Sequence, residues 1–321
     1  MNTSPKIDAL FAKTRPVCFG RFVMDVPANA DLIFGGQAFG PNIETFENGS
    51  KDLKKLASSK KTELEAIKHR EEVGSLFRSE VDGPTEGSWT LLFWSSRNST
   101  YTTDVWGYLS APPHGFLYKG LASPIDGRPL EGEVKKLTYV ANNLRARQPD
   151  EVPTEPGVCL DLGFIKDDGG KFQEIFNIGL RFPSLPDVSF SISSNKDARR
   201  DTSFEERRNE AKKAALMHAP LATLFGKVKT LREGKHDVFR WKGDEALFRR
   251  PLDDERKGVW HEFQFEYPGI RYDHHNPGWE AALFTGVKGN TAGAQASSLT
   301  DDEAIALWDR LLATVRLRVP N

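Results

Sequence analysis

Hydrophobic and polar residues follow two periods along this chain, and the periods recur in the same order in both halves. Loose alternation, typical of strands, is followed by an amphipathic helix, further alternating runs and a second helix. In the first half, strands are expected at residues 17–26, 31–34, 42–46, 88–94, 101–109 and 115–119. Helices are expected from about residue 50 to about residue 73, with Leu53, Leu56, Leu64 and Ile67 on one face, and from residue 130 to about residue 144.

The second half repeats this order. Strands are expected at residues 158–164, 172–182, 188–193, 238–241, 246–249, 259–266 and 281–285. Ser203 and Glu206 form the pattern of a capping box, in which the two side chains satisfy exposed amides at a helix start. The helix that they open must break or kink before Pro220. A last helix is expected at residues 300–312, opened by a second capping box at Thr300.

Two short motifs also occur once in each half. Cys18 and Cys159 lie in matching strand-like runs, and the pairs Arg145/Arg147 and Arg316/Arg318 each follow a predicted helix. This repetition predicts a tandem duplication, with one domain at residues 1–150, a second at residues 151–321 and a proline-rich linker between them. The fold class is α+β, with two tandem, structurally similar modules, each a mostly antiparallel sheet packed with helices.

The two cysteines are the only ones in the chain and can form at most one disulfide. Equivalent positions in separate modules usually lie in separate cores, and buried free cysteine is common. Two buried free thiols are therefore expected, with a disulfide as the alternative.

The composition narrows the choice of partner. The formal net charge of -1 argues against nucleic acid, because a phosphate-binding face usually leaves a basic excess. The sequence has no run of roughly 20 apolar residues that could span a membrane. Residues 1–13 lack an apolar run of signal-peptide type, so the chain is expected to be either cytosolic or an exported form without its signal.

Motifs of known catalytic chemistry are absent from the sequence, including the hydrolase Gly-x-Ser-x-Gly, the phosphate loop and His-Glu-x-x-His. His261, Asp273, His274 and His275 could together ligate zinc, but a polar turn before Pro277 explains the last three more simply. The acidic run at residues 253–255 is interpreted as a charged hairpin tip rather than an acid/base pair, and residues 167–170 as a β-turn rather than a calcium loop. No metal, no cofactor and no enzymatic activity are expected.

A binding role fits the aromatic and basic residues better. Trp106 and Tyr108 lie on the same face of one predicted strand, where they either fill the core or form an interface. Trp, Tyr and Arg dominate the energetic centres of protein interfaces. The candidate partner-binding residues are therefore Trp106, Tyr108, Arg249, Arg250 and Arg256.

Both halves resemble a family of immunity proteins that neutralise lipase effectors of the bacterial type VI secretion system and carry paired amino- and carboxy-terminal Tle-cognate domains. The resemblance lies in the order of short segments: residues 16–22 (PVCFGRF), 25–27, 156–164, 242–245, 261–265, 284–286, 299–304, 307–312 (LWDRLL) and 315–318. It implies a non-enzymatic protein of the periplasm that binds a phospholipase effector, clamps it between two domains and inhibits it.

Two other functions compete with this one. A periplasmic protein that binds a small molecule or lipid in the cleft between its domains is the alternative. A hydrolase whose site follows no known motif is the third possibility, and the missing nucleophile motif weighs against it.

Overall fold

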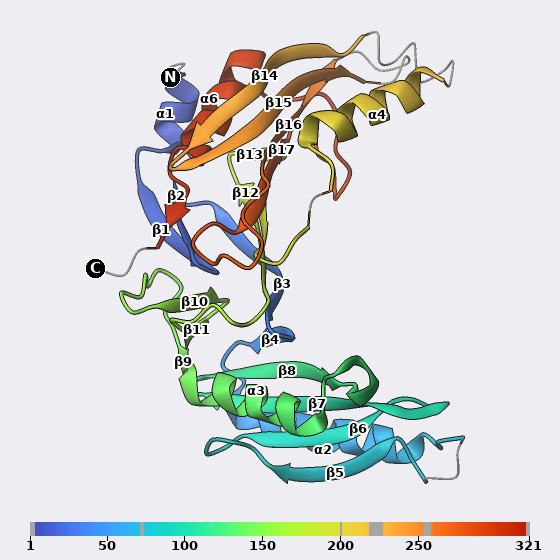
Figure 1. Ribbon diagram of the computed structural model, residues 1–321. Coiled ribbons are helices and arrows are strands. Elements are labelled where there is room, and N and C mark those ends of the chain that lie inside the picture. Colours follow the sequence, from blue (N-terminus) through green and yellow to red (C-terminus); the bar gives the residue numbers. More distant parts are fainter. Residues whose placement is uncertain (1–3, 71–73, 200, 218–226, 253–257, 319–321) are drawn as a thin grey trace. The chain divides into compact units, whose positions relative to one another are not determined.

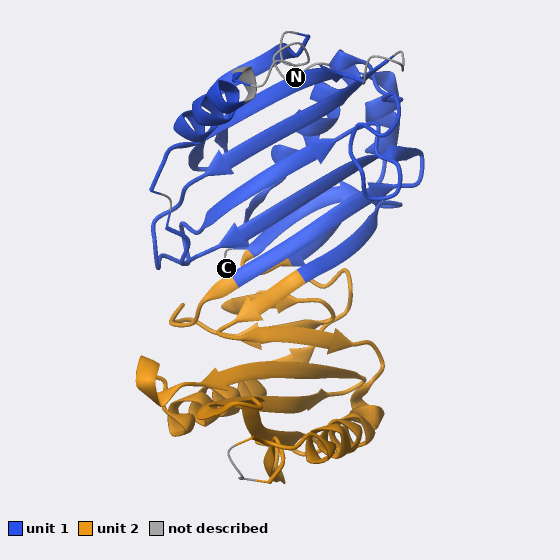
Figure 2. Ribbon diagram, turned by 90° about the vertical axis from the view of Figure 1, so that its right-hand side faces the viewer, with its two compact units in different colours: residues 1–18, 22–35, 175–318 blue, residues 19–21, 36–174, 319–321 orange. Residues whose placement is uncertain are grey.

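The structure, a computed structural model, describes residues 4–70, 74–199, 201–217, 227–252 and 258–318. The chain divides into two compact units, each made of separate stretches of sequence (Figure 2). Unit 1 comprises Met1–Cys18, Phe22–Gly35 and Ile175–Arg318. Unit 2 comprises Phe19–Arg21, Gly36–Glu174 and Val319–Asn321.

The described elements occur in the same order in both halves of the chain (Figure 1). The first half contains β1 (Thr14–Phe19), β2 (Phe22–Pro27), β3 (Asp31–Phe39), β4 (Asn42–Phe46), α2 (Leu53–Ala66), β5 (Phe77–Asp82), β6 (Trp89–Ser96), β7 (Ser99–Ala111), β8 (His114–Ala122), α3 (Leu130–Asn143) and β9 (Leu144–Ala146). The second contains β10 (Gly157–Leu160), β11 (Gly163–Lys166), β12 (Glu174–Phe182), β13 (Leu185–Asn195), α4 (Phe204–Leu216), β14 (Lys229–Val238), β15 (Trp241–Pro251), β16 (Val259–Tyr267), β17 (Gly278–Phe284), α6 (Asp301–Leu312) and β18 (Arg316–Leu317). A short helix α1 (Pro5–Leu10) precedes the first half.

The main sheet of each unit also follows one pattern. Its strand order is β14-β15-β16-β17-β13-β12 in unit 1 and β5-β6-β7-β8-β4-β3 in unit 2, where β3 contributes its residues 36–39. Corresponding strands occupy corresponding places, and the neighbours β6 and β7 pair antiparallel, as do β15 and β16. The predicted α+β fold with two similar modules is confirmed.

The two halves exchange their first hairpins. Within unit 1, β2 of the first half pairs with β18 of the second, with Val23 opposite Arg316. Within unit 2, β11 of the second half pairs with β9 of the first, with Phe164 opposite Arg145. Each arginine motif begins in a short strand, β9 or β18. That strand is the third member of a three-stranded sheet, and the hairpin that forms the rest of the sheet comes from the other half of the chain. This exchange is why each compact unit draws on both halves of the sequence.

Two strand predictions are wrong because each covers most of an exchanged hairpin. Residues 17–26 and 158–164 were each expected to form one strand, but each contains a tight turn, with Gly20 at φ 51° and Leu162 at φ 54°. Leucine rarely adopts the left-handed region, so the sequence carries no signal for the second turn. Residues 238–241, also expected as a strand, include the turn between β14 and β15, where Phe239 has φ 55°.

Both cysteines are disulfide-bonded, so the expectation of two free thiols is wrong. That expectation placed each cysteine in its own module. In unit 2, however, the Gly20 N–H donates to the Cys159 carbonyl at 2.8 Å, and the Cys159 N–H donates to the Gly20 carbonyl at 2.8 Å. This bridge leaves Cys18 two residues from the partner of Cys159, within reach of a disulfide.

Helices cover both faces of the sheet in unit 2 (Figure 1). On one face, α2 contributes Leu53, Ala57 and Leu64 to a core with residues of β6, β7 and β8. This helix ends at Ala66, earlier than expected, and Leu56 lies outside the core, 37% exposed. On the other face, α3 lies so close that a Cβ on Gly107 would come within 2.3 Å of a Leu137 methyl carbon. A glycine in this strand permits that approach.

In unit 1, α6 packs against the main sheet through Trp308. The side chain is fully buried, its ring lies 6.1 Å from the rings of Phe190 and Phe263, and its Nε1 donates to Glu245 at 3.2 Å. Thr300 caps the helix in the predicted box with Glu303. The predicted boundary of this last helix and its capping box are confirmed.

Candidate functional site

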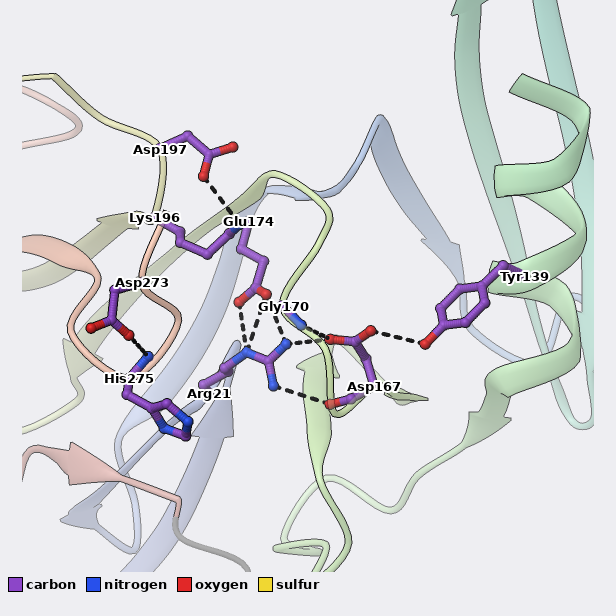
Figure 3. Close-up of polar contacts among 9 residues, drawn as sticks. All are labelled: Arg21, Tyr139, Asp167, Gly170, Glu174, Lys196, Asp197, Asp273 and His275. Atoms are coloured by element: carbon purple, nitrogen blue, oxygen red, sulfur yellow. Dashed lines mark hydrogen bonds and ion pairs between the residues drawn. The ribbon is translucent and has the colours of Figure 1, made fainter. Parts of the chain in front are cut away.

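A buried cluster of charged side chains in unit 2 is centred on Arg21, which follows β1 (Figure 3). The guanidinium donates from Nε to Glu174 Oε2 at 2.9 Å and from Nη2 to Glu174 Oε1 at 2.8 Å. It also donates from Nη2 to Asp167 Oδ2 at 2.5 Å and from Nη1 to the Asp167 carbonyl at 3.1 Å. Two carboxylates thus surround one cation, and all three residues are buried.

Asp167 has further partners in the same cluster. Tyr139 donates its hydroxyl to Asp167 Oδ1 at 2.9 Å, and the Gly170 N–H donates to Oδ2 at 3.0 Å (Figure 3). Burial alone would raise the pKa of Asp167, but the hydrogen bonds from Arg21, Gly170 and Tyr139 outweigh it and lower the pKa. The predicted turn at residues 167–170 is therefore built on an ionised aspartate. The guanidinium of Arg21 lies between the two carboxylates and binds both, which indicates a role in holding unit 2 together.

His261 has an arrangement that superficially resembles a hydrolase triad. Its Nδ1 lies 2.9 Å from Thr285 Oγ1, and its Nε2 lies 3.1 Å from Asp301 Oδ1. Burial lowers the pKa of His261, against the opposing effect of Asp301. Because His261 and Thr285 are both fully buried, no substrate can reach the hydroxyl. The arrangement links β16 and the residue that follows β17 to the first residue of α6.

The residues considered for a metal site lie in two places with different roles. His261 is committed to Thr285 and Asp301, as described above. Asp273 accepts hydrogen bonds from the backbone N–H groups of His275 at 2.8 Å and Asn276 at 3.3 Å, as in a polar turn. Within the described ranges, the structure contains no group of three or more His, Cys, Asp or Glu residues placed to hold a metal ion. The acidic run at residues 253–255 lies outside those ranges.

Trp106 and Tyr108 face α2 and its core. Tyr108 belongs to that core and is 3% exposed, and burial raises its pKa to about 12. Trp106 is half-buried, and its ring lies 5.1 Å from Lys60 Nζ and 5.0 Å from Lys119 Nζ. Trp106 therefore has more surface to offer a partner than Tyr108 has. A binding role for either residue stays a prediction.

The arginine candidates lie in unit 1. Arg249 and Arg250 are neighbours on β15 and point to opposite faces of the sheet. Arg249 pairs with Asp301 at 3.3 Å, whereas Arg250 pairs with Glu262 and lines a cavity of about 640 Å³ between α4 and the sheet. Arg256 lies outside the described residues. A binding role for these arginines also stays a prediction.

Two aromatic side chains of unit 1, Phe239 and Tyr272, are exposed but were not among the residues predicted from the sequence to bind a partner. Both have a left-handed backbone, with φ 55° and φ 68°. The run of polar residues from Arg271 to Asn276 was interpreted only as a turn, and Phe239 as part of a strand. The dipeptide Pro268-Gly269 was a sequence signal that could have placed Tyr272 in a loop, whereas the residues around Phe239 carry no such turn signal.

No helix of the described residues is both long and apolar enough to cross a membrane.

Together, the sites described above contain structural ion pairs, a buried histidine and exposed aromatic loops.

Comparison with known families identifies the family to which this protein belongs. Residues 151–320 match the model of the Tle cognate immunity protein 4 C-terminal domain, and residues 15–119 match that of its N-terminal domain. The chain belongs to this family of type VI secretion immunity proteins. Membership confirms the resemblance noted in the sequence and does not favour the alternative of a ligand-binding periplasmic protein. No curated protein matched the chain significantly.

Solved structures give the same result. The apo structure of the immunity protein TplEi of the type VI secretion system from Pseudomonas aeruginosa is 27% identical, with a TM-score of 0.80 over 96% of this chain and 98% of that chain. A chain in the crystal structure of the Tle4–Tli4 complex is 26% identical, with a TM-score of 0.81 over 97% of this chain and 99% of that one. TplEi in complex with the "L" peptide has 27% identity and a TM-score of 0.75, covering 96% of this chain and 99% of that one.

Proposed function

We propose that this protein binds a cognate lipase effector of the type VI secretion system and inhibits it. The observation that carries the proposal is the match of both family domains, together with similarity over almost the full length to a chain of the Tle4–Tli4 complex. In this proposal the protein itself catalyses no reaction. The burial of His261 and Thr285 supports that part, because a triad closed to solvent cannot accept substrate.

We place this activity in the periplasm. The Cys18–Cys159 disulfide supports the location, because disulfides persist in oxidising compartments such as the periplasm and are rare in the cytosol. A lipase that attacks membrane phospholipid from that side would be met there by its inhibitor.

We further propose that the inhibitor clamps the effector through contacts from both family domains, with the division near residue 150. Two joined contacts reinforce each other, since the second forms at a high effective concentration once the first is made. The exchanged hairpins limit how this can be tested. A cut at residue 150 would separate β10 and β11 from β9, so each fragment would lose a strand pairing of its unit.

The test therefore uses the intact chain. The chain is co-expressed with a type VI lipase effector from the same genome, with an affinity tag on the lipase alone. Co-purification at a fixed ratio, together with loss of phospholipid hydrolysis in the complex, is the expected result. Failure of the two proteins to associate, or hydrolysis by the chain alone, would refute the proposal.

A further inference from the structure

Two loops of unit 1 present large apolar side chains to solvent. One is the turn of Phe239 and Arg240 between β14 and β15, and the other is the loop at residues 268–277 between β16 and β17. Phe239 and Ile270 are each 56% exposed, and Tyr272 is 60% exposed. We call Phe239, Arg240, Ile270, Arg271 and Tyr272 the loop surface. Folding gains little from such side chains, because the free energy of burial scales with the apolar area removed from water.

The backbone of the loop surface argues against a purely structural role. Phe239 has φ 55° and Tyr272 has φ 68°, a region that bulky side chains rarely adopt and that glycine or asparagine adopts at lower cost. Backbone strain of this kind concentrates at functional sites, where the surrounding structure enforces it. Here an exposed aromatic residue occupies a strained position in each of two loops.

Hydrogen bonds hold both loops and join them to each other. The Ile270 N–H donates to the Asn276 carbonyl at 2.8 Å, and the Tyr272 N–H donates to the Lys196 carbonyl at 3.1 Å. Asp273 adds the turn described above, which Figure 3 shows with His275. Arg240 Nη2 donates to the His275 carbonyl at 2.5 Å and so ties the β14–β15 turn to the second loop. A surface ordered in advance loses less entropy when a partner binds.

The arginines define the chemistry of a partner. The guanidinium of Arg271 lies 4.4 Å from the centre of the Tyr272 ring, and that of Arg240 lies 5.8 Å from the Phe239 ring. The guanidinium groups of Arg271 and Arg240 donate to the carbonyl oxygens of Asp197 and His275 respectively, and among the described residues neither forms an ion pair. Rings and guanidinium groups arranged together form the composition typical of an interface centre.

We infer that the loop surface is a contact through which unit 1 binds the lipase effector, an inference that rests on the proposed function. The matching segment of the effector presents carboxylates beside apolar side chains. The carboxylates pair with Arg240 and Arg271, and the apolar groups cover Phe239, Ile270 and Tyr272. The strained aromatic residues are explained if binding, and not folding, requires them.

The test is the double variant Phe239→Asn, Tyr272→Asn in the full chain. Asparagine suits the left-handed backbone, so we expect a melting temperature equal to or above that of the parent. Affinity for the purified lipase, measured by calorimetry, should fall at least about 10-fold, as for loss of interface-centre residues. The control is Tyr101→Asn, which removes an aromatic side chain that is 67% exposed in unit 2. It should change affinity less than about 3-fold.

A second variant tests the charges. Arg240→Gln with Arg271→Gln should weaken binding and reduce its dependence on salt, because screening acts on the lost ion pairs. If the parent binds and inhibits the lipase and the double asparagine variant binds it equally well, the loop surface is not an effector contact, and the proposed function stands. An equal loss of affinity in Tyr101→Asn would also overturn the assignment of the loop surface as the contact. If the parent itself does not bind the lipase, both proposals fail.

Discussion

Arg21 and Glu174 form a two-point ion pair inside unit 2, with N–O distances of 2.9 and 2.8 Å, although 153 residues separate them in sequence. Asp167 binds the same guanidinium from the other side. The pair connects the turn of the first hairpin to the start of β12. Within unit 2, Arg21 therefore joins a residue of the first half of the chain to two residues of the second half.

Replacing Arg21 should therefore destabilise the fold strongly. Arg21→Ala leaves two buried carboxylates without their cation, and breaking a buried pair in this way costs about 3–5 kcal/mol. Chemical denaturation measures the loss. The matched control is Lys135→Ala, whose ion pair with Glu131 is exposed and should contribute at most about 0.5 kcal/mol. Equal effects of the two variants would contradict the role assigned to Arg21.

The buried histidine predicts a pH dependence of stability. Burial lowers the pKa of His261 in the folded protein below its value of 6.5 in the unfolded chain. The unfolded state therefore binds more protons as the pH falls below about 6.5, and the contribution of the neutral histidine to stability is lost there. The free energy of unfolding should drop more between pH 7.5 and pH 5 in the parent than in His261→Gln. Parallel curves for the two proteins would show that His261 is not responsible.

Trp308 should be the most sensitive position of α6. Its ring fills the space between Phe190 and Phe263, so Trp308→Ala is expected to cost about 3–5 kcal/mol in the free energy of unfolding. Trp308→Phe keeps most of the ring but loses the hydrogen bond to Glu245, and should cost less. Thermal melting compares the two. A Trp308→Ala variant that melts with the parent would rule out this packing.

The disulfide should stabilise the native protein by about 2–5 kcal/mol, the range for native disulfides. Cys18→Ala with Cys159→Ala removes it without introducing a polar group at two buried positions. The melting temperature of this variant should match that of the parent in reductant. If reduction leaves the parent's melting temperature unchanged, the bond contributes nothing to stability.

The order of elements and the duplication could be predicted from the sequence because they depend on local signals. The apolar spacing of α3 and the capping box at Thr300 are complete within a few residues each. The matching cysteines and arginine pairs also marked equivalent positions correctly. What they could not indicate is which hairpin each closing strand joins, because strand pairing depends on contacts distant in sequence.

The candidate site was harder to predict for the same reason. Arg21 meets Asp167 and Glu174 only after the exchange, and nothing near it in sequence signals a buried cation. Trp106 and Tyr108 could be assigned to one strand face but not to the core beneath α2. Phe239 and Tyr272 have backbone conformations that their residue types disfavour, so local propensity gave the wrong expectation for the turn at residue 239.

Inhibition of a type VI lipase by direct binding can be tested in a single titration. Phospholipid hydrolysis by a purified type VI lipase from the same genome is measured on phospholipid vesicles while the intact chain is titrated in. We expect hydrolysis to fall in proportion to added protein and to stop at a fixed molar ratio, while the chain alone releases no fatty acid. Full lipase activity at a large excess of the chain would contradict this expectation.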